Sequence, residues 1–356
     1  MTEFDAAPAA RAPEAAAAPA AGDEPPPVEP GPPPLPPMNP GPPLSTAAGG
    51  APTPAMPTVT WPAPPEAVMR VFAIGNIGFD FGTEARRDTF RQLMPRVVGD
   101  GSSPALMAPN PYDTKQLADY LNANPSESTK LIWTLNLDLT PVYAIEAEAT
   151  YADDVYSKLR AALEYQALSA EDEKFISRVS LPGVLTTRTV RLFSGQVVPV
   201  VVTQPRGLYL WKEAAIIDAV MDATDTASLN VDHARVRRKV RQMLDKVYYQ
   251  LRNLGTASPD RAINFMATNA FVVTEGIWRS LLSGEIVDGD STNLYSLDTI
   301  SAVKSPYCRI DSDCWDVQIS FFDPENDNRA RVVFQTTIDV SDELPVQLAP
   351  THRFPC

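Results

Sequence analysis

Proline is distributed very unevenly along this chain of 356 residues, and that asymmetry limits how much of the chain can fold. Of the 36 prolines, 21 lie in the first 65 residues, in runs such as DEPPPVEPGPPPLPP among alanine, glycine and small polar residues. Such a segment buries too little apolar surface to offset the entropy of ordering. We therefore predict a disordered, partly polyproline II tail over residues 1–66 and a folded domain over residues 67–356. The tail is either a spacer or, through PPPLPP, a ligand for a proline-recognition domain.

Charge and cysteine content narrow the class of protein. The net charge of −14 argues against nucleic acid and anionic membranes as partners, because phosphate contact requires excess positive charge. The longest apolar run, VVPVVV, is far shorter than the roughly 20 residues of a membrane span. The acidic start lacks the apolar stretch of a signal peptide, and three cysteines without an export signal suggest a reducing compartment. We expect a cytoplasmic protein that binds neither nucleic acid nor membrane.

Hydrophobic periodicity after residue 67 predicts an α+β fold with mixed sheets and several packed helices. Period-two alternation and turn signals favour strands over residues 69–81, 129–149, 190–202, 293–304, 314–323 and 329–340. Apolar spacing and capping residues favour helices over residues 83–94, 113–125, 153–168, 232–253 and 258–282. Pro199 cannot donate a ladder hydrogen bond, so we expect its strand at the edge of a sheet.

Several long motifs resemble one known family. They include IGNIGFDFGTEARRD, IWTLNLDLTPVYAI, RNLGTASPDRAINFMATNAF and PYCRIDSDCWDVQISFFDPENDNRARVVFQTTIDVSDELPV. Together they are similar to the C-terminal domain of the PatA and PatG cyanobactin maturation proteases, from residue 69 to residue 346. Those proteins process ribosomal precursor peptides into macrocycles, and their chemistry belongs to a separate subtilisin-like domain.

The resemblance implies a non-catalytic binding or assembly module for peptide maturation, because only the Pro/Ala-rich tail precedes the matching region. We expect it to act as a homodimer with a precursor peptide, or with a protease or modifying enzyme on another chain. In GTASPD, Ala257 occupies the place of a subtilisin-type nucleophile, and Ser258 is better explained as a helix cap. The chain is therefore not expected to be an autonomous serine protease. A purely structural stand-alone domain is a further alternative.

The three cysteines and one of the two histidines fall into two local pairs. Cys308 and Cys314 are separated by five residues, and His352 lies four positions before Cys356. Three thiolates and one imidazole form a common structural zinc set, so one structural zinc ion held by these four residues is one hypothesis. Buried inert thiols and reactive or disulfide-forming thiols are the alternatives. A peptide-processing enzyme built on a Cys/His/Asp metal cluster would need an open coordination position and one of Asp311, Asp313 and Asp316.

Two other stretches suggest binding roles. GNIGFDFG, from Gly75 to Gly82, lacks the glycine order and the lysine of nucleotide loops, so we interpret it as a tight turn. The predicted helix over residues 232–253 is basic and is either a solvated face or a contact for an acidic peptide or a second subunit. Its cationic residues are Arg235, Arg237, Arg238, Lys239, Arg241 and Lys246.

Overall fold

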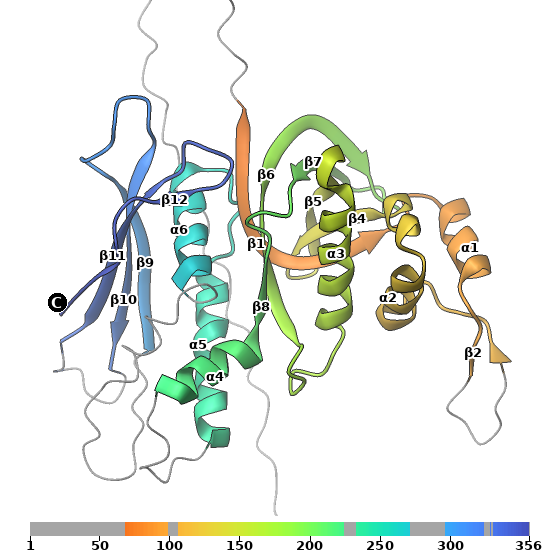
Figure 1. Cartoon of the computed structure of the whole chain (residues 1–356), viewed down its shortest axis with the longest axis horizontal. Helices are drawn as coiled ribbons and strands as arrows, with labels where there is room; N and C mark the ends of the chain where they lie inside the picture. The colour runs from red at the N-terminus through yellow and green to blue at the C-terminus, as the bar shows by residue number, and fades with distance from the viewer. Residues whose placement is uncertain are drawn as a thin grey trace, which may run out of the picture. The chain divides into compact units, whose positions relative to one another are not determined.

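The computed structural model describes residues 68–98, 106–223, 233–270, 296–323, 328 and 330–355. The chain divides into two units, Met1–Ala63 and Pro64–Cys356, and all described residues belong to the second. That unit combines helices with mixed sheets, which confirms the predicted α+β class (Figure 1). The predicted tail lies outside the described residues. No helix in the described ranges is long and apolar enough to cross a membrane.

Five strands of the first half close into a barrel. They are β1 (Met69–Asp80), β4 (Ile132–Leu137), β5 (Thr140–Ala147), β6 (Ile176–Arg191) and β7 (Val197–Thr203). Their order is β1-β4-β5-β7-β6, and β6 pairs back with β1 to complete the ring. The β5–β7 pair is parallel and every other pair in the ring is antiparallel. In chain order, helix α3 (Ala152–Gln166) connects β5 to β6. This strand order and this position of the helix are those of an OB-fold, a small Greek-key barrel.

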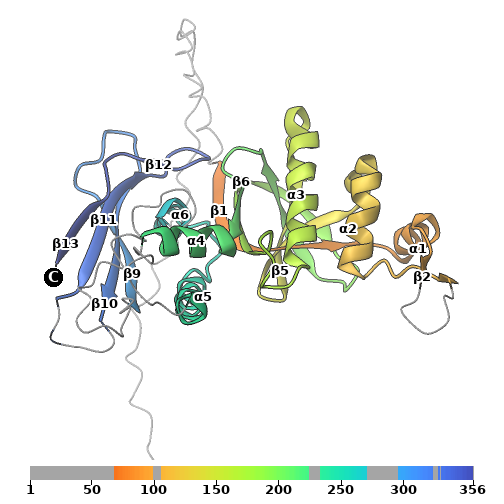
Figure 2. The ribbon, with the colours of Figure 1, turned by 60° about the horizontal axis from the view of Figure 1, so that its bottom comes forward.

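Alternation along the strands directs apolar side chains into the ring. Val71, Trp133, Ile145, Leu181 and Val201, one from each strand, are buried in a single cluster. Helices α1 (Glu84–Leu93), α2 (Thr114–Ala123) and α3 contribute further residues to the same cluster (Figure 2). Between β1 and β4 also lie β2 (Val97–Val98), β3 (Leu106–Met107) and the 3-10 helix η1 (Pro125–Lys130), and η2 (Ala149–Tyr151) precedes α3.

Strand β1 changes its partner half-way along its length. Residues up to Gly75 pair with β6, and those from Asn76 onward pair with β4. A Cβ atom at Gly75 would lie 2.5 Å from the carbonyl oxygen of Asn136, so only glycine allows the strands to approach this closely. Beyond the change, Ile77 lies opposite Leu135 of β4, and the side-chain amide of Gln166 also donates to and accepts from its backbone. In this way a single long strand closes the ring, because its first half pairs with β6 and its second half pairs with β4.

The second half packs three helices with a second sheet. Its elements are α4 (Glu213–Ala223), α5 (His233–Gln250), α6 (Ser258–Thr268), β9 (Ser296–Lys304), β10 (Cys314–Phe322), β11 (Val332–Asp339), β12 (Val346–Gln347) and β13 (His352–Pro355). The sheet order is β12-β11-β10-β9, with β13 also paired to β11, while β8 (Tyr209–Lys212) extends the barrel beside β6. Helix α6 contacts β1 as well as β9, β10 and β11, so it joins the barrel to the second sheet (Figure 1).

Three details differ from the sequence-based expectations. GNIGFDFG is not a turn for most of its length, because Gly75 and Gly78 lie inside β1. The strand of Pro199 is not at an edge, because β7 lies between β5 and β6; Pro199 itself faces only Thr189 of β6, since the β5–β7 ladder begins at Val200. Ser258 is the first residue of α6 and Ala257 occupies the cap position. The predicted continuation of this helix beyond residue 270 lies outside the described residues.

Candidate functional site

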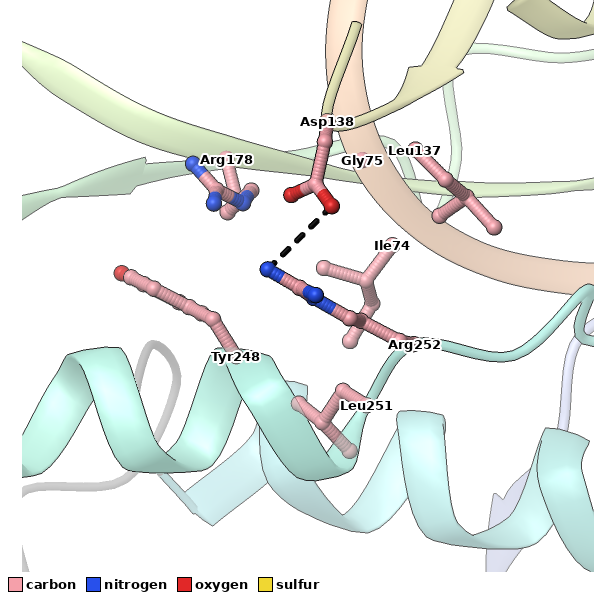
Figure 3. A pocket seen from close by; sticks show the side chains of 8 residues that line it. All are labelled: Ile74, Gly75, Leu137, Asp138, Arg178, Tyr248, Leu251 and Arg252. Carbon is pink, nitrogen blue, oxygen red and sulfur yellow. Dashed lines mark ion pairs between the residues drawn. The ribbon is translucent and has the colours of Figure 1, made fainter. Parts of the chain in front are cut away.

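A small pocket opens at the partner change of β1. Its walls come from β1, the end of β4, the start of β6 and the end of α5 (Figure 3). The lining residues are Ile74, Gly75, Leu137, Asp138, Arg178, Tyr248, Leu251 and Arg252. The space inside the pocket is about 10 Å³, room for about one water molecule, and the wider hollow of about 270 Å³ includes open solvent. The pocket is therefore too small to enclose a metabolite, and a ligand would contact it from its open side.

Each arginine of the pocket lies over a tyrosine ring. The guanidinium carbon of Arg178 is 4.7 Å from the ring centre of Tyr248, and that of Arg252 is 5.1 Å from the ring centre of Tyr249. Arg178 also donates from Nη1 to the backbone oxygen of Ser177 at 2.7 Å. At these distances each ring attracts the cation above it and helps to hold the guanidinium in place.

Asp138 supplies the carboxylate of the pocket. It occupies the tight turn between β4 and β5 with φ of 54°, a conformation that Asp adopts more readily than most residues. Its Oδ2 atom forms an ion pair with Nη2 of Arg252 at 3.2 Å, and both side chains are about half exposed. Exposed pairs of this kind contribute about 0–1 kcal/mol. The Asp138–Arg252 contact can therefore be exchanged for another at little cost.

Exposed apolar side chains lie close in the sequence to the residues that line the pocket. Leu139, next to Asp138 in the turn, is 94% exposed, while Tyr249 is 69% and Leu254 is 49% exposed. The position of Leu254 is fixed by Tyr143, whose hydroxyl donates to the Leu254 backbone oxygen at 2.7 Å. Burial raises the pKa of Tyr143 to about 12, so this donor remains protonated. Exposed leucine and tyrosine beside a charged pocket are typical of protein and peptide contacts.

A buried polar network lies behind the Tyr248 ring. The Tyr248 hydroxyl is hydrogen-bonded to Ser177, which also contacts the carboxylate of Glu213 at the start of α4. Burial raises the pKa of Glu213, an effect that its ion pair with Arg241 at 3.3 Å opposes but does not cancel. Burial also raises the pKa of Tyr248. This network holds the start of β6 against α5 and so fixes the wall of the pocket.

The two internal cysteines lie side by side, Cys308 in the loop after β9 and Cys314 at the start of β10. The backbone N–H of Cys314 donates to Sγ of Cys308 at 3.0 Å, and the Cys308 thiol donates to the Ser312 oxygen at 2.9 Å. Both thiols are free. Burial, followed by the hydrogen bond with Cys308, raises the pKa of the Cys314 thiol to about 11. Proton loss from Cys314, which metal binding or nucleophilic attack would require, is therefore disfavoured.

The structure does not bring His352 to these cysteines. Cys314 is opposite Asp339 on β11, whereas His352 is opposite Gln335 of the same strand. Four residues of strand separate those two positions by about 13 Å. Zinc ligands lie about 2.0–2.3 Å from the ion, so in this conformation one zinc ion cannot contact both Cys314 and His352. Cys356 lies outside the described residues, and within the described ranges no three His, Cys, Asp or Glu side chains form a metal-binding group.

The loop that contains Cys308 holds the start of α6. Burial raises the pKa of Asp313, but hydrogen bonds from Lys304, Ser258 and Trp315 outweigh that effect, so its pKa is lowered overall. One turn further along α6, the buried Arg261 donates to the Val340 oxygen at 2.6 Å. Its Nε and Nη1 atoms have no hydrogen-bond partner in the described part of the chain. Asp313 thus stabilises the N-terminus of α6, and Ser258 has a structural partner.

Comparisons with known proteins agree with this architecture. The family profile described as PatG Domain matches residues 70–187, and that described as PatG C-terminal matches residues 230–354. A solved structure named "PatG Domain of Unknown Function" is 39% identical, with a TM-score of 0.66, and the match covers 81% of this chain and 99% of that one. The chain belongs to the PatG domain family. No curated protein matches it.

The basic helix expected from the sequence is α5 of this PatG domain. Arg241 forms ion pairs with Glu171 at 2.6 Å and with Glu213, and Lys246 donates to Ser296. The side chain of Arg238 is exposed. Those of the other three cationic residues, Arg235, Arg237 and Lys239, lie outside the described part. Two of the predicted basic residues, Arg241 and Lys246, therefore bind neighbouring segments of the same chain.

Sequence reasoning did not find the pocket of the PatG domain. Asp138, Arg178 and Tyr248 come from three distant segments, and none of them belongs to a recognisable motif. The available signals were an acidic residue followed by an exposed leucine in the hairpin turn, and the Tyr-Tyr pair at the end of α5.

Proposed function

We propose that this chain is a non-catalytic peptide-binding module in PatG-family maturation of ribosomally synthesised peptides. It would act with a protease or modifying enzyme on another chain, in the cytoplasm. The observation that carries the proposal is the pocket at the partner change of β1. There, two arginines and one aspartate line the pocket, and exposed leucine and tyrosine residues lie next to them in the sequence.

The size of the pocket favours a peptide over a metabolite. A site for a small molecule buries most of its ligand, and this pocket is too small for that. An extended peptide could place one polar group at the open side of the pocket and lay the neighbouring side chains across Leu139, Tyr249 and Leu254. Tyr and Arg are enriched at the energetic centres of such contacts.

The chemistry of the lining favours binding over catalysis. Nucleophilic catalysis requires a nucleophile beside a general base, and the polar residues that line the pocket are Asp138, Arg178, Tyr248 and Arg252. Asp138 is paired with an arginine, and the Tyr248 hydroxyl is hydrogen-bonded to Ser177 and has a raised pKa. These groups are suited to holding a ligand.

A titration with a full-length precursor peptide of a PatG-family pathway tests this function. Leu139→Lys should weaken binding to the complete chain by about tenfold or more, because it replaces the exposed apolar side chain next to Asp138 with a charge. Ile310→Lys is the matched control, since Ile310 is also 94% exposed but lies in the loop that contains Cys308. Fluorescence anisotropy measures the affinity, and mass spectrometry of the recovered peptide detects cleavage. Equal effects of the two substitutions, or cleavage by this chain alone, would refute the proposal.

The expected homodimer belongs to the same proposal. Light scattering of the purified chain distinguishes a monomer from a dimer. If the purified chain is a dimer, and the dimer dissociates when peptide is added, then the peptide and the second subunit bind the same surface.

A further inference from the structure

We infer that the pocket recognises a carboxylate group of the bound peptide, and that Asp138 occupies the place of this carboxylate when no peptide is bound. The inference rests on the proposed function, because it specifies the chemistry of the ligand at that same site. Three observations carry it: the local balance of charge, the orientation of the two arginines, and the weakness of the contact that Asp138 makes.

The charge of the pocket is incompletely balanced. Two guanidinium groups, Arg178 and Arg252, face one carboxylate, Asp138. Within the described residues, Asp138 forms its ion pair with Arg252, while Arg178 makes no ion pair. A second carboxylate would therefore find a positive partner here, although the whole chain carries a net charge of −14.

Arg178 and Arg252 are placed where both could bind a carboxylate. Tyrosine rings lie under both guanidinium groups, and Figure 3 shows Arg178 and Arg252 on two sides of the Asp138 carboxylate. A guanidinium has five N–H donors, of which Arg178 directs one to the Ser177 oxygen. The planar edge that remains matches a carboxylate, which arginine binds through two parallel hydrogen bonds.

Asp138 behaves as an exchangeable internal ligand. Its ion pair with Arg252 is 3.2 Å long, and the two side chains are 48% and 52% exposed. Solvent screens such a pair, so a peptide carboxylate that also contacts Arg178 could replace it. The adjacent Leu139 lies in the same turn and would then contact an apolar neighbour of the peptide carboxylate.

The ligand class that follows is a peptide with a carboxylate beside an apolar residue. The carboxylate is either a Glu or Asp side chain or the C-terminus. Three synthetic probes separate these sources. They are acetyl-Gly-Ser-Leu-Glu-Phe-Ser-Gly-amide, its glutamine twin, and acetyl-Gly-Ser-Leu-Phe with a free C-terminal carboxylate.

The test measures the affinity of each probe for the full chain and for Asp138→Asn, Arg178→Gln and Arg178→Lys. We expect the glutamate probe to bind about tenfold more tightly than its glutamine twin. Asp138→Asn should tighten binding of the glutamate probe by about threefold or more, because the competing carboxylate is gone while Asn still tolerates the positive φ. Arg178→Gln should remove the preference, and Arg178→Lys should retain part of it, because it keeps the charge without the planar fork.

The Asp138→Asn variant makes the inference falsifiable even where an arginine substitution disturbs the fold. A purely structural role for Asp138 would give unchanged or weaker binding in this variant, and either result would overturn the inference. Equal affinity for the glutamate and glutamine probes would do the same. A full-length precursor that binds Arg178→Gln normally but Leu139→Lys poorly would overturn the carboxylate inference and leave the proposed function standing. A tighter-binding C-terminal probe would assign the site to peptide ends.

Discussion

The side-chain amide of Asn264, on α6, donates a 2.8 Å hydrogen bond to the backbone oxygen of Phe72, on β1. The two residues are 192 positions apart in the sequence, and Asn264 is fully buried. The same amide also contacts Asn253, which in turn accepts from the backbone N–H of Gly255. A single side chain therefore links the barrel to the segment that connects α5 and α6.

Replacing Asn264 should expose the importance of this link. Asn264→Ala leaves the Phe72 oxygen and the Asn253 side chain without their partner, so we expect a loss of about 2–3 kcal/mol in the free energy of unfolding. Asn122→Ala is the control, because Asn122 is exposed and its hydrogen bond to Glu164 lies at the surface. Urea denaturation measures both, and a loss in the control as large as in Asn264→Ala would contradict the assignment.

Alanine substitutions at two glycines should distinguish the cost of steric crowding from the cost of backbone strain. Gly255 has φ of 64°, and a Cβ there would lie 2.2 Å from the Phe72 oxygen, whereas Gly195 has φ of 89° and its Cβ would meet nothing nearer than 3.6 Å. Gly195→Ala should cost about 1–2 kcal/mol, which is the strain of the left-handed conformation alone. Gly255→Ala should cost clearly more and could prevent folding, because two backbone segments must separate. Thermal melting tests this, and similar melting temperatures for the two variants would show that the Gly255 segment can shift freely.

Glu213 should make stability depend on pH in a direction opposite to that of most paired carboxylates. Burial raises its pKa above the ordinary value of 4.5, so the folded state holds the proton more tightly than the unfolded state. Its contribution is therefore greatest at low pH and declines as pH rises from about 4.5 through the folded-state pKa.

The Glu213→Gln variant isolates that contribution. The stability difference, parent minus variant, should fall as pH rises, because the glutamine does not ionise. Denaturation at several pH values measures the difference, with the exposed Asp119→Asn as control. A difference that grows with pH would mean that the ion pair with Arg241 dominates over burial.

The zinc site predicted from the sequence can be tested with substitutions of His352 and Cys308. The structure places Cys308 and Cys314 together and His352 about 13 Å away along β11, so any zinc bound by the cysteines should not depend on the histidine. If the parent contains zinc, His352→Ala should keep its zinc content and Cys308→Ser should reduce it, as measured by elemental mass spectrometry under reducing conditions. Loss of zinc in both variants would require a different arrangement of the C-terminus. A parent without zinc would identify two free thiols.

Local elements of this fold were predictable because local chemistry determines them. Thr83 accepts from the N–H of Arg86 and begins α1 where the capping pattern placed it, and β10 follows the alternation of CWDVQISFF. The ring of strands was not predictable, because β1 pairs with both β4 and β6, and β6 begins about 100 residues later in the chain. Pro199 misled for the same reason. A proline usually indicates an edge strand, but β7 also pairs with β5, which is distant in the chain, and that ladder begins at Val200, one residue after Pro199.

The candidate site divides in the same way. The contact between Cys308 and Cys314 is local, across the turn that leads into β10, so their spacing in the sequence indicated it. The pocket depends on where a hairpin turn, a strand and a helix end meet, and no local spacing encodes that meeting. The proximity of His352 to Cys356 in the sequence says nothing about its distance from Cys314, so the four-residue zinc site stays a prediction.

The position of β7 in the ring has a consequence for anyone who divides this chain. The PatG Domain profile ends at residue 187, before β7 (Val197–Thr203), yet β7 lies between β5 and β6. A fragment cut at that limit would expose two unpaired strand edges and would be prone to associate through them. It would also uncover Phe72, whose ring packs edge-on against Phe265 of α6. The region that the PatG Domain profile matches is thus smaller than the barrel to which it belongs.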